Sequence, residues 1–397
     1  MFESLQMAPA DPILGLNEAF QKDSHPQKVN LSVGVYKDEQ GVTPILTSVK
    51  RAEERLLSSE GTKSYLAITG SANYDRLVQQ LLFGPGHVCL EQRRVETLQS
   101  PGGTGALRVA ADFIHQHFPQ SAVWCSRPTW ANHPQIFQAA GLRVHHYAYL
   151  DATARRIDFS AMLDDLSRVP PGDVVLLHAC CHNPSGVDLS KAQWAQVAQL
   201  LKDRDLLPLV DFAYQGFGEG LEEDAAGMRA VAATLPDLLI ASSFSKNFGL
   251  YRERVGALSV VAANEEAARV ALSHLKLCVR TNYSNPPAHG AMIVETILED
   301  DALRSLWHEE LDLMRRRIAG MRQLFVQTMQ SCAPRHDFDF LLEQKGMFSF
   351  SGLRPEQVDR LRDEYAIYIV RSGRINVAGI TPHNCEPLCQ AVASVLD

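Results

Sequence analysis

One lysine stands out for the groups that accompany it. Lys246 lies in the segment SFSKNFGLYRERVG, residues 243–256, which joins two apolar runs. Ser243 and Ser245 precede it and Arg254 follows eight residues later, so two hydroxyls and a guanidinium can bind a phosphate dianion near the amine. A lysine held beside such an anion can form an imine with a carbonyl of the bound molecule. A lone S-x-S-K segment is more often a solvated loop, so this interpretation depends on the rest of the chain.

A carboxylate and a phenol follow a second apolar run, residues 206–210. Asp211 comes directly after this run and Tyr214 three residues later. Open α/β sheets bind ligands at the carboxyl ends of their strands, so Asp211 is expected to face a ligand. A pyridoxal ring acts as an electron sink while its nitrogen is protonated, and a partly buried aspartate keeps that proton in place. Tyr214 can hydrogen-bond the phenolate oxygen. The alternative for Asp211 is a helix N-cap.

Two further loops follow expected strands. Residues 178–186 (HACCHNPSG) contain Asn183, whose amide can share the phenolate oxygen with Tyr214 and so lower the proton affinity of the imine. Residues 100–107 (SPGGTGAL) are glycine-rich, which lets a backbone approach a phosphate at the start of a helix. This loop is neither a Walker loop nor G-x-G-x-x-G, so it does not favour a nucleotide. Taken alone, each loop is also compatible with an ordinary turn.

The elements that must position these residues are short apolar strands alternating with amphipathic helices between residues 91 and 261. This order predicts βαβ units and one large α/β domain with a mainly parallel sheet. The expected strands are Val95–Gln99, Ala122–Ser126, Arg143–Tyr147, Val174–His178, Leu206–Asp211, Leu238–Ser242 and Val255–Val261.

The rest of the chain predicts a smaller α+β domain. Apolar residues recur every three or four positions from 300 to 330, which indicates one long amphipathic helix that can bridge two lobes. Strand-like pieces follow at Met347–Ser351, Ala366–Val370 and Arg374–Ala378, with a helix between them. We expect residues 1–44 to form an N-terminal arm and part of the small domain, 45–300 the large domain, and 301–397 the linking helix and small C-terminal domain.

Composition excludes several classes of function. The 397 residues carry a net charge of −8 and their basic residues are scattered, which does not favour nucleic acid or acidic lipid as a partner. The sequence has no run of about 18 apolar residues and no export signal, so we expect a cytoplasmic protein without a membrane anchor.

The eight cysteines lack C-x-x-C pairs and fit a reducing compartment. Cys385 and Cys389, with His383 nearby, are interpreted as two buried thiols on one helix face rather than metal ligands, and no metal is expected.

Taken together and in this order, these motifs resemble the class I aminotransferases of the fold-type I pyridoxal phosphate superfamily, in the branch of aspartate and aromatic aminotransferases. The resemblance covers nearly the whole chain. It includes residues 11–14 (DPIL), 30–38 (NLSVGVYKD), 63–66 (KSYL), 128–133 (PTWANH), 282–287 (NYSNPP), 346–350 (GMFSF) and 372–374 (SGR).

The resemblance implies a pyridoxal 5'-phosphate site with Lys246 bonded to the cofactor as an imine and acting later as the general base. It implies that Asp211 pairs with the pyridine nitrogen and that Asn183 and Tyr214 bind the phenolate oxygen. The remaining cofactor contacts that it implies are a ring stacked on Trp130 and a phosphate held by Gly103, Thr104, Ser243, Ser245 and Arg254, with Tyr65 supplied by a neighbouring subunit. His133 and His178 are supporting candidates, and His182 is interpreted as structural.

The resemblance also implies how substrate binds. Arg374 would bind the substrate α-carboxylate, near Gly34, while Trp130 and Asn183 also contact the substrate. Arg280, from the neighbouring subunit of a homodimer with shared active sites, would face a side-chain carboxylate. A guanidinium is the best bidentate partner of a carboxylate, so two arginines suit a dicarboxylic substrate.

The expected activity is amino transfer from an L-amino acid to 2-oxoglutarate, with aspartate favoured and aromatic amino acids also accepted. Positions near Arg280 carry the polar set typical of aspartate-selective members: Val35, Lys37, Thr43, Thr104 and Asn285. Ser64 departs from the usual asparagine. The alternatives are an aromatic-amino-acid aminotransferase, a lyase or decarboxylase of the same fold, and a non-catalytic sensor that binds the cofactor.

Overall fold

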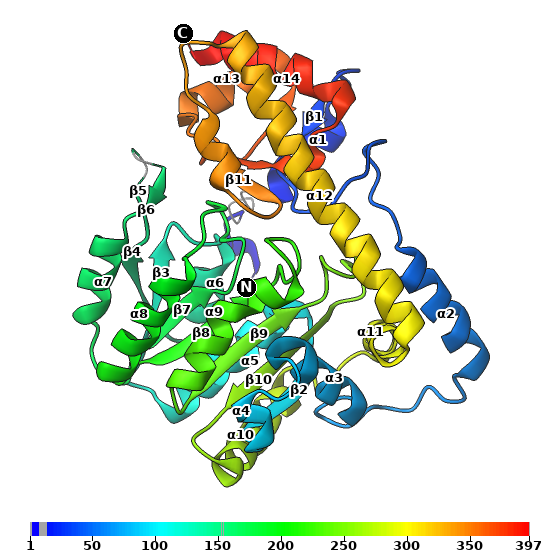
Figure 1. Ribbon diagram of the computed structural model, residues 1–397, viewed down its shortest axis with the longest axis vertical. Coiled ribbons are helices and arrows are strands. Elements are labelled where there is room, and N and C mark those ends of the chain that lie inside the picture. Colours follow the sequence, from blue (N-terminus) through cyan, green and yellow to red (C-terminus); the bar gives the residue numbers. More distant parts are fainter. Residues whose placement is uncertain (1, 8–13, 152, 154, 397) are drawn as a thin grey trace. The chain divides into compact units, whose positions relative to one another are not determined.

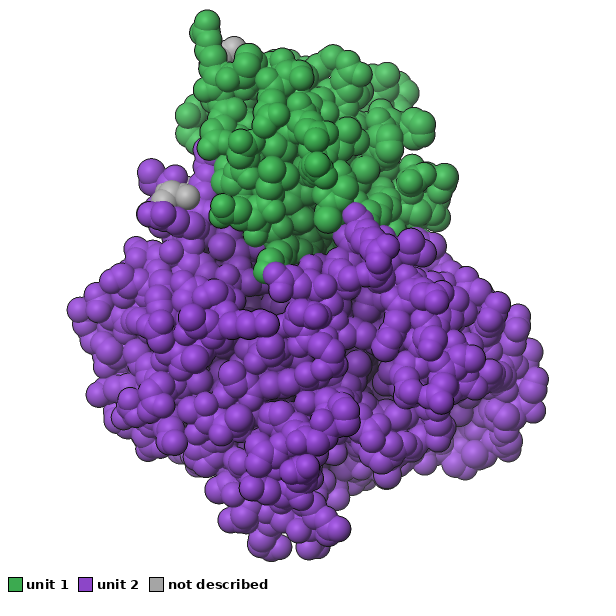
Figure 2. Space-filling model, in the orientation of Figure 1, with its two compact units in different colours: residues 1–43, 317–397 green, residues 44–316 purple. Residues whose placement is uncertain are grey.

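The computed structural model describes residues 2–7, 14–151, 153 and 155–396. The first three residues of the DPIL motif, 11–13, therefore lie outside the described residues. The chain forms two compact units (Figures 1 and 2). One unit comprises residues 44–316, and the other joins residues 1–43 to residues 317–397.

The larger unit is built on a seven-stranded sheet with the order β2-β10-β9-β8-β7-β3-β4 (Figure 1). Neighbours from β9 to β4 are parallel, whereas β10 is antiparallel to both β2 and β9. The strands are β2 (Val95–Pro101), β3 (Ala122–Arg127), β4 (Arg143–Ala148), β7 (Val174–His178), β8 (Leu207–Phe212), β9 (Leu238–Ser243) and β10 (Val255–Val261). A separate two-stranded sheet pairs β5 (Leu150–Asp151) with β6 (Arg156–Ile157).

Each of the seven runs predicted as strands forms a strand of this sheet, with ends that differ by no more than two residues. The α/β class with a mainly parallel sheet is therefore confirmed. Strands β9 and β10 are buried along their whole lengths, as expected where helices cover both faces of a sheet. Continuous burial explains why these runs are apolar throughout instead of alternating.

Helices enclose the sheet. α5 packs on β9 and β10 and meets α10, so Val109, Ile114, Leu258 and Leu275 share one apolar cluster. None of the helices in the described part of the chain combines the length and apolar character needed to cross a bilayer. The helices of this unit are α2 (Thr47–Ser59), α3 (Ala72–Phe83), α4 (Val88–Glu91), α5 (Gly102–His117), α6 (Asn132–Ala139), α7 (Phe159–Ser167), α8 (Lys191–Asp203), α9 (Leu221–Thr234), α10 (Glu265–Asn282) and α11 (Ala288–Glu299).

The smaller unit joins the two ends of the chain. β1 (Val29–Asn30) pairs in parallel with β12 (Ile367–Tyr368), and β11 (Phe348–Phe350) pairs antiparallel with β13 (Arg374–Asn376). Tyr368 also donates a hydrogen bond to the carboxylate of Asp23 (2.8 Å). The helices are η1 (Phe2–Ser4), α1 (Leu14–Lys22), η2 (Asp339–Glu343), α13 (Pro355–Tyr365), η3 (Val377–Gly379) and α14 (Pro382–Leu396).

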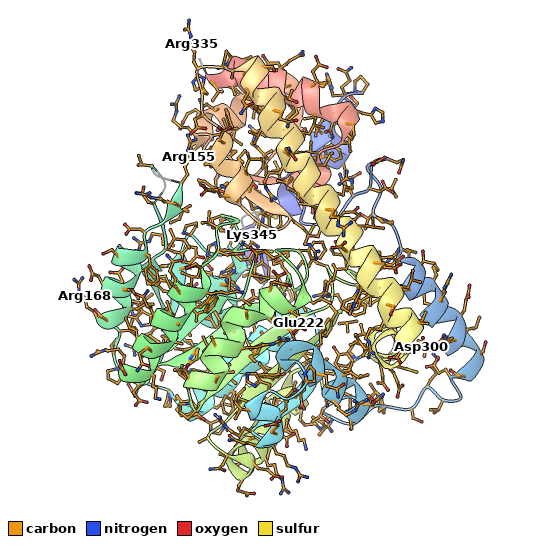
Figure 3. The ribbon with its side chains drawn as sticks, in the orientation of Figure 1. Arg155, Arg168, Glu222, Asp300, Arg335 and Lys345 are labelled. Carbon is orange, nitrogen blue, oxygen red and sulfur yellow. The ribbon has the colours of Figure 1, made fainter. Side chains whose placement is uncertain are left out.

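One long helix contributes to both units. α12 (Asp301–Cys332) matches the amphipathic helix predicted for residues 300–330, and the two units divide within it, between Arg316 and Arg317. Asp300 (Figure 3) fixes the start of α12. Its carboxylate accepts the N–H of Leu303 (2.8 Å) and pairs with Arg55 of α2 (2.7 Å). Its apolar stripe is buried at Leu303, Trp307, Leu311, Met314, Ile318 and Phe325.

Asp75, in the first turn of α3, is an acidic residue in an apolar setting. Its side chain is buried, and the carboxyl oxygen Oδ1 has no hydrogen-bond partner within the described part of the chain. Burial, together with the nearby charges of Glu96 and Glu295, raises the pKa of Asp75 to about 9. In the unfolded chain the pKa of an aspartate is about 3.9. The folded protein therefore keeps a proton that the unfolded chain releases, so this group lowers stability as pH rises from about 4 towards 9.

We expect Asp75→Asn to increase the free energy of unfolding, because the amide stays neutral at every pH. The gain should be small at pH 4.5 and on the order of 2 kcal/mol at pH 8. Urea titrations at both pH values would measure it, with Asp164→Asn on the exposed face of α7 as a control within about 0.5 kcal/mol of the parent. A gain that does not grow with pH would contradict the assignment.

Candidate active site

Three strand ends meet at one edge of the large sheet. β2 ends where α5 begins, β9 ends at Ser243, and β10 begins at Val255. Because β10 runs antiparallel between the other two, Gly256 pairs with both Ser100 and Ser243. The glycine-rich loop, the serines and Arg254 are therefore brought together although the sequence separates them by about 150 residues.

The groups at this edge form an anion cradle, defined here as Gly102, Gly103, Ser243, Ser245 and Arg254. Arg254 donates from Nη1 to the hydroxyl of Ser245 (3.3 Å), and the hydroxyls of Ser243 and Ser245 lie 3.2 Å apart. Arg254 also donates to the carbonyl of Tyr251 (2.9 Å), and among the described residues its hydrogen-bond partners include no carboxylate. The N-terminus of α5 adds partial positive charge, so the cradle suits a phosphate. Thr104 is the third residue of α5.

Lys246 lies beside the cradle with its amine buried against aromatic and charged groups. Its Nζ atom is 5.0 Å from the centre of the Tyr214 ring. Burial lowers the pKa of Lys246; the negative charge of Asp211 opposes the shift and the positive charge of Arg254 adds to it. A lowered pKa favours the neutral form of the amine, which can act as a nucleophile or a base.

Asp211, at the end of β8, is held as a carboxylate by a histidine. Burial would raise the pKa of Asp211, but the hydrogen bond from His133 (2.9 Å) and the nearby His178 and Lys246 lower it overall. Thr129 continues the chain of hydrogen bonds, because its hydroxyl lies 2.8 Å from His133 Nδ1 and 3.2 Å from His178 Nε2. The ring of Trp130 meets His133 edge-on, with ring centroids 5.1 Å apart. The side chain of Asp211 is only 11% exposed, so its charge faces little water.

Asn183 lies in the loop that follows the neighbouring strand, β7. β7 lies beside β8 with His178 opposite Asp211, and Asn183 follows five residues later. Its side chain is buried, and within the described residues the amide oxygen has no hydrogen-bond partner. Leaving a buried polar atom unpaired costs about 1–3 kcal/mol. The unpaired amide oxygen therefore points to a hydrogen-bond donor supplied by a ligand.

The other expected site residues have different surroundings. Tyr65 is 93% exposed, and Arg280, near the end of α10, is exposed and donates a hydrogen bond to Ser284. In the smaller unit, Arg374 of β13 is buried, donates to the carbonyl of Ser32 (2.5 Å) and lies 4.1 Å from the centre of the Phe348 ring.

Gly34 completes that second group. A Cβ atom at Gly34 would lie 2.6 Å from the Phe348 ring, so the backbone passes directly beside the ring that supports Arg374. Sequence reasoning gave no role to Phe348 or to Thr129. Both lie in motifs quoted above, but only the fold shows that one packs on Arg374 and the other links two histidines.

A possible metal site also occurs within the described residues. Ligand atoms of Cys180, Cys181 and Asp224 lie within 4.8 Å of one another, and all three residues are buried. The carboxylate of Asp224 already accepts backbone N–H groups of Gly216 (2.8 Å), Gly218 (2.9 Å) and Glu219 (2.8 Å). We therefore assign Asp224 to holding the loop before α9.

The larger unit thus offers an anion cradle, a lysine of lowered pKa, an ionised carboxylate and an unpaired amide at one sheet edge. The first three fit the phosphate, carbonyl and pyridine nitrogen of pyridoxal phosphate, in that order, and the Nδ2 group of the Asn183 amide can donate to its phenolate oxygen. A site of this composition on an α/β sheet defines an enzyme that uses pyridoxal phosphate.

Comparison with known proteins identifies the family. The model of the family "Aminotransferase class I and II" matches residues 26–392. The chain is 56% identical to the aspartate aminotransferase of Escherichia coli K12 over all of both chains, and 50% identical to the aromatic-amino-acid aminotransferase of Pseudomonas aeruginosa over 99% of this chain and 98% of that one. It is also similar to the crystal structure of an aromatic-amino-acid aminotransferase from Burkholderia pseudomallei covalently bound to pyridoxal phosphate, with a TM-score of 0.97, 48% identity and full coverage of both chains.

The chain therefore belongs to the class I and II aminotransferases, in the aspartate and aromatic branch. It is an aminotransferase of fold type I, and its cofactor is pyridoxal phosphate.

The cradle can be tested through cofactor affinity. Gly102 has φ +73°, and a Cβ atom there would lie 2.4 Å from Nη2 of Arg254. We expect Gly102→Ala to displace Arg254 and to weaken binding of pyridoxal phosphate to the apoprotein at least tenfold, about 1.4 kcal/mol. Equilibrium dialysis measures this, with Gly61→Ala as control because a Cβ at Gly61 meets nothing within 4 Å. Unchanged affinity of Gly102→Ala would refute the placement of the phosphate.

Proposed function

We propose that this enzyme transfers the amino group of L-aspartate to 2-oxoglutarate in a ping-pong cycle and accepts aromatic amino acids as secondary substrates. The observation that carries the amino-transfer chemistry is the setting of Lys246, whose pKa burial lowers beside the carboxylate of Asp211 and the guanidinium of Arg254. An aspartate preference is supported by 56% identity to an aspartate aminotransferase over the whole chain.

Pyridoxal phosphate, when bound, supplies the electron sink for the reaction. The phosphate would be held by the anion cradle with Thr104, and by Tyr65 of a second subunit. Asp211, kept ionised by His133, would hold the proton on the pyridine nitrogen. Tyr214 and the amide of Asn183 would donate to the phenolate oxygen, and Trp130 would stack on the ring.

Lys246 would have two roles. Its amine would bond the cofactor in the resting enzyme and, once displaced by the substrate amine, would take the proton from the substrate α-carbon. A lysine can do this only as a neutral amine, which its burial favours. The same amine would then deliver the proton to the C4′ carbon of the cofactor, so no other base is required.

Two arginines would bind the substrate. Arg374 would form paired hydrogen bonds with the α-carboxylate; its guanidinium is oriented by the Phe348 ring and the carbonyl of Ser32. Because Gly34 has no side chain, its backbone could lie directly beside that carboxylate. Arg280 would pair with the side-chain carboxylate of aspartate or 2-oxoglutarate. An aromatic substrate would leave Arg280 unpaired, so it would have to turn towards water.

The active form would be a homodimer with shared sites. Tyr65 and Arg280 are both exposed: Tyr65 lies in a loop and Arg280 near the end of α10. Asn285, three residues beyond α10, donates from Nδ2 to the carbonyl of Leu66 beside Tyr65 (2.7 Å). Large exposed side chains nearby in sequence, such as Leu57 (88% exposed) and Leu277 (60%), suit burial by a partner. A monomeric mass for the active enzyme in analytical ultracentrifugation would refute this.

The cytoplasm is the proposed location. All eight cysteines are free thiols and seven of them are buried, which suits a reducing compartment.

Polar positions at Lys37, Thr43 and Asn285 support aspartate as the preferred substrate. The runner-up is a preference for tyrosine or phenylalanine, which the 50% identity to an aromatic-amino-acid aminotransferase favours.

Lys246→Ala should abolish 2-oxoglutarate-dependent transamination of aspartate, because no other side chain is assigned to the proton transfer. It should also abolish the covalent attachment of cofactor that borohydride reduction and peptide mass mapping detect in the parent enzyme. Lys202→Ala, on the exposed face of α8, should leave both unchanged. Turnover near the parent rate in Lys246→Ala would overturn the assignment.

The roles of Arg280 and Arg374 can be distinguished by comparing two substrates. We expect Arg280→Leu to lower kcat/KM for aspartate at least 100-fold but for phenylalanine less than about tenfold, because only aspartate has a second carboxylate to pair. Arg374→Leu should lower both by similar factors. Arg269→Leu, which removes an exposed arginine of the same helix, serves as the control. Equal losses for both substrates in Arg280→Leu would contradict the role, and a parent enzyme with higher kcat/KM for phenylalanine would favour the runner-up.

A further inference from the structure

Two cysteines of the smaller unit face each other outside the catalytic machinery. Cys385 and Cys389 lie one turn apart on α14, and their Sγ atoms are 4.0 Å apart. Both side chains are buried. They pack against α12, where the hydroxyl of Thr328 lies 3.8 Å from Cys385 Sγ and the carbonyl of Phe325 lies 3.8 Å from Cys389 Sγ.

The two thiols are not equivalent. Cys385 is the fourth residue of α14, near the positive end of the helix dipole, which favours a thiolate. Cys389 is one turn further along and is the thiol that keeps its proton, which it can donate either to the carbonyl of Phe325 or to Cys385 Sγ. The hydrogen bond between the thiols lowers the pKa of Cys385 to about 7, and it raises the pKa of Cys389 together with burial.

The helix between the two cysteines is weakened. Pro387 lies inside α14, between Cys385 and Cys389. A proline inside a helix removes one i→i−4 hydrogen bond and clashes with the carbonyl four residues earlier. Residues four apart on a helix have Cα atoms about 6 Å apart, within the range of disulfides, but their Cβ atoms, about 5–6 Å apart, must approach to about 4 Å. The local weakness lets the sulfurs close the remaining gap of about 2 Å.

We propose that Cys385 and Cys389 form a reversible, peroxide-oxidised dithiol, a modification site that is independent of the amino-transfer reaction. The 4.0 Å separation of two buried sulfurs across a proline, with one of them at a helix N-terminus, carries this assignment.

The chemistry balances with hydrogen peroxide as the oxidant. The Cys385 thiolate attacks one peroxide oxygen, the O–O bond breaks, and the departing hydroxide takes a proton to leave as water. The sulfur becomes a sulfenic acid. Cys389 sulfur then attacks Cys385 sulfur, the S–O bond breaks, and a second water leaves with the Cys389 proton. Two thiols are oxidised to one disulfide while one peroxide is reduced to two waters.

The test uses the holoenzyme, treated with a modest excess of hydrogen peroxide, quenched with catalase, denatured and alkylated with N-ethylmaleimide. Untreated protein has eight free cysteines to alkylate. We expect treated protein to take up two fewer alkyl groups, both lost from the peptide of α14, whose mass should be two hydrogens below that of the reduced, unalkylated peptide. Dithiothreitol should restore them.

Variants identify the pair. Cys385→Ser and Cys389→Ser should each eliminate the disulfide, whereas Cys332→Ser, which removes the cysteine that ends α12, should retain it. Peptide mapping of the parent enzyme gives the answer even if a variant fails to fold. The proposal is overturned if treated parent protein keeps all eight thiols, if the lost thiols map to other cysteines, or if Cys332→Ser abolishes the disulfide.

Discussion

The antiparallel placement of β10 between β2 and β9 is the constraint on which the candidate site depends. A wholly parallel sheet would send the start of the next strand to the far edge. Here the start of β10 lies at the same edge as the ends of β2 and β9, so Arg254 arrives beside Ser243 and the start of α5. Backbone hydrogen bonds along three strands therefore hold the cradle, which gives it more rigidity than loops alone provide.

Around that edge, burial and charge are balanced against each other. Asp211 would favour its neutral form if it were only buried, but the hydrogen bond from His133 keeps it charged. Lys246 and His178 instead favour their neutral forms. Burial lowers the pKa of each, and that of His178 falls to about 3. The result is one ionised carboxylate beside a neutral imidazole and an amine whose neutral form is favoured. A protein core that holds such groups gives up stability to make them available for catalysis.

Much of this arrangement could be predicted from the sequence because it depends on local pattern. The seven apolar runs predict the strands, and Asn183, Asp211 and Lys246 lie at or shortly after the ends of β7, β8 and β9. Pairing partners could not be predicted in the same way. That β10 lies between β2 and β9 depends on contacts across some 150 residues. The link from Asp211 through His133 and Thr129 to His178 depends on how α6 packs at the end of β8, which no spacing in the sequence encodes.

The unpaired amide of Asn183 has a consequence for folding. Among the described residues its oxygen has no partner, and the groups of the cradle likewise satisfy one another only in part. A ligand that supplies the missing partners binds the folded chain and not the unfolded one, so it adds RT ln(1 + [L]/Kd) to the free energy of unfolding. Folding and cofactor binding are then linked equilibria. The supply of cofactor in the cell would set how much of the polypeptide persists in its folded form.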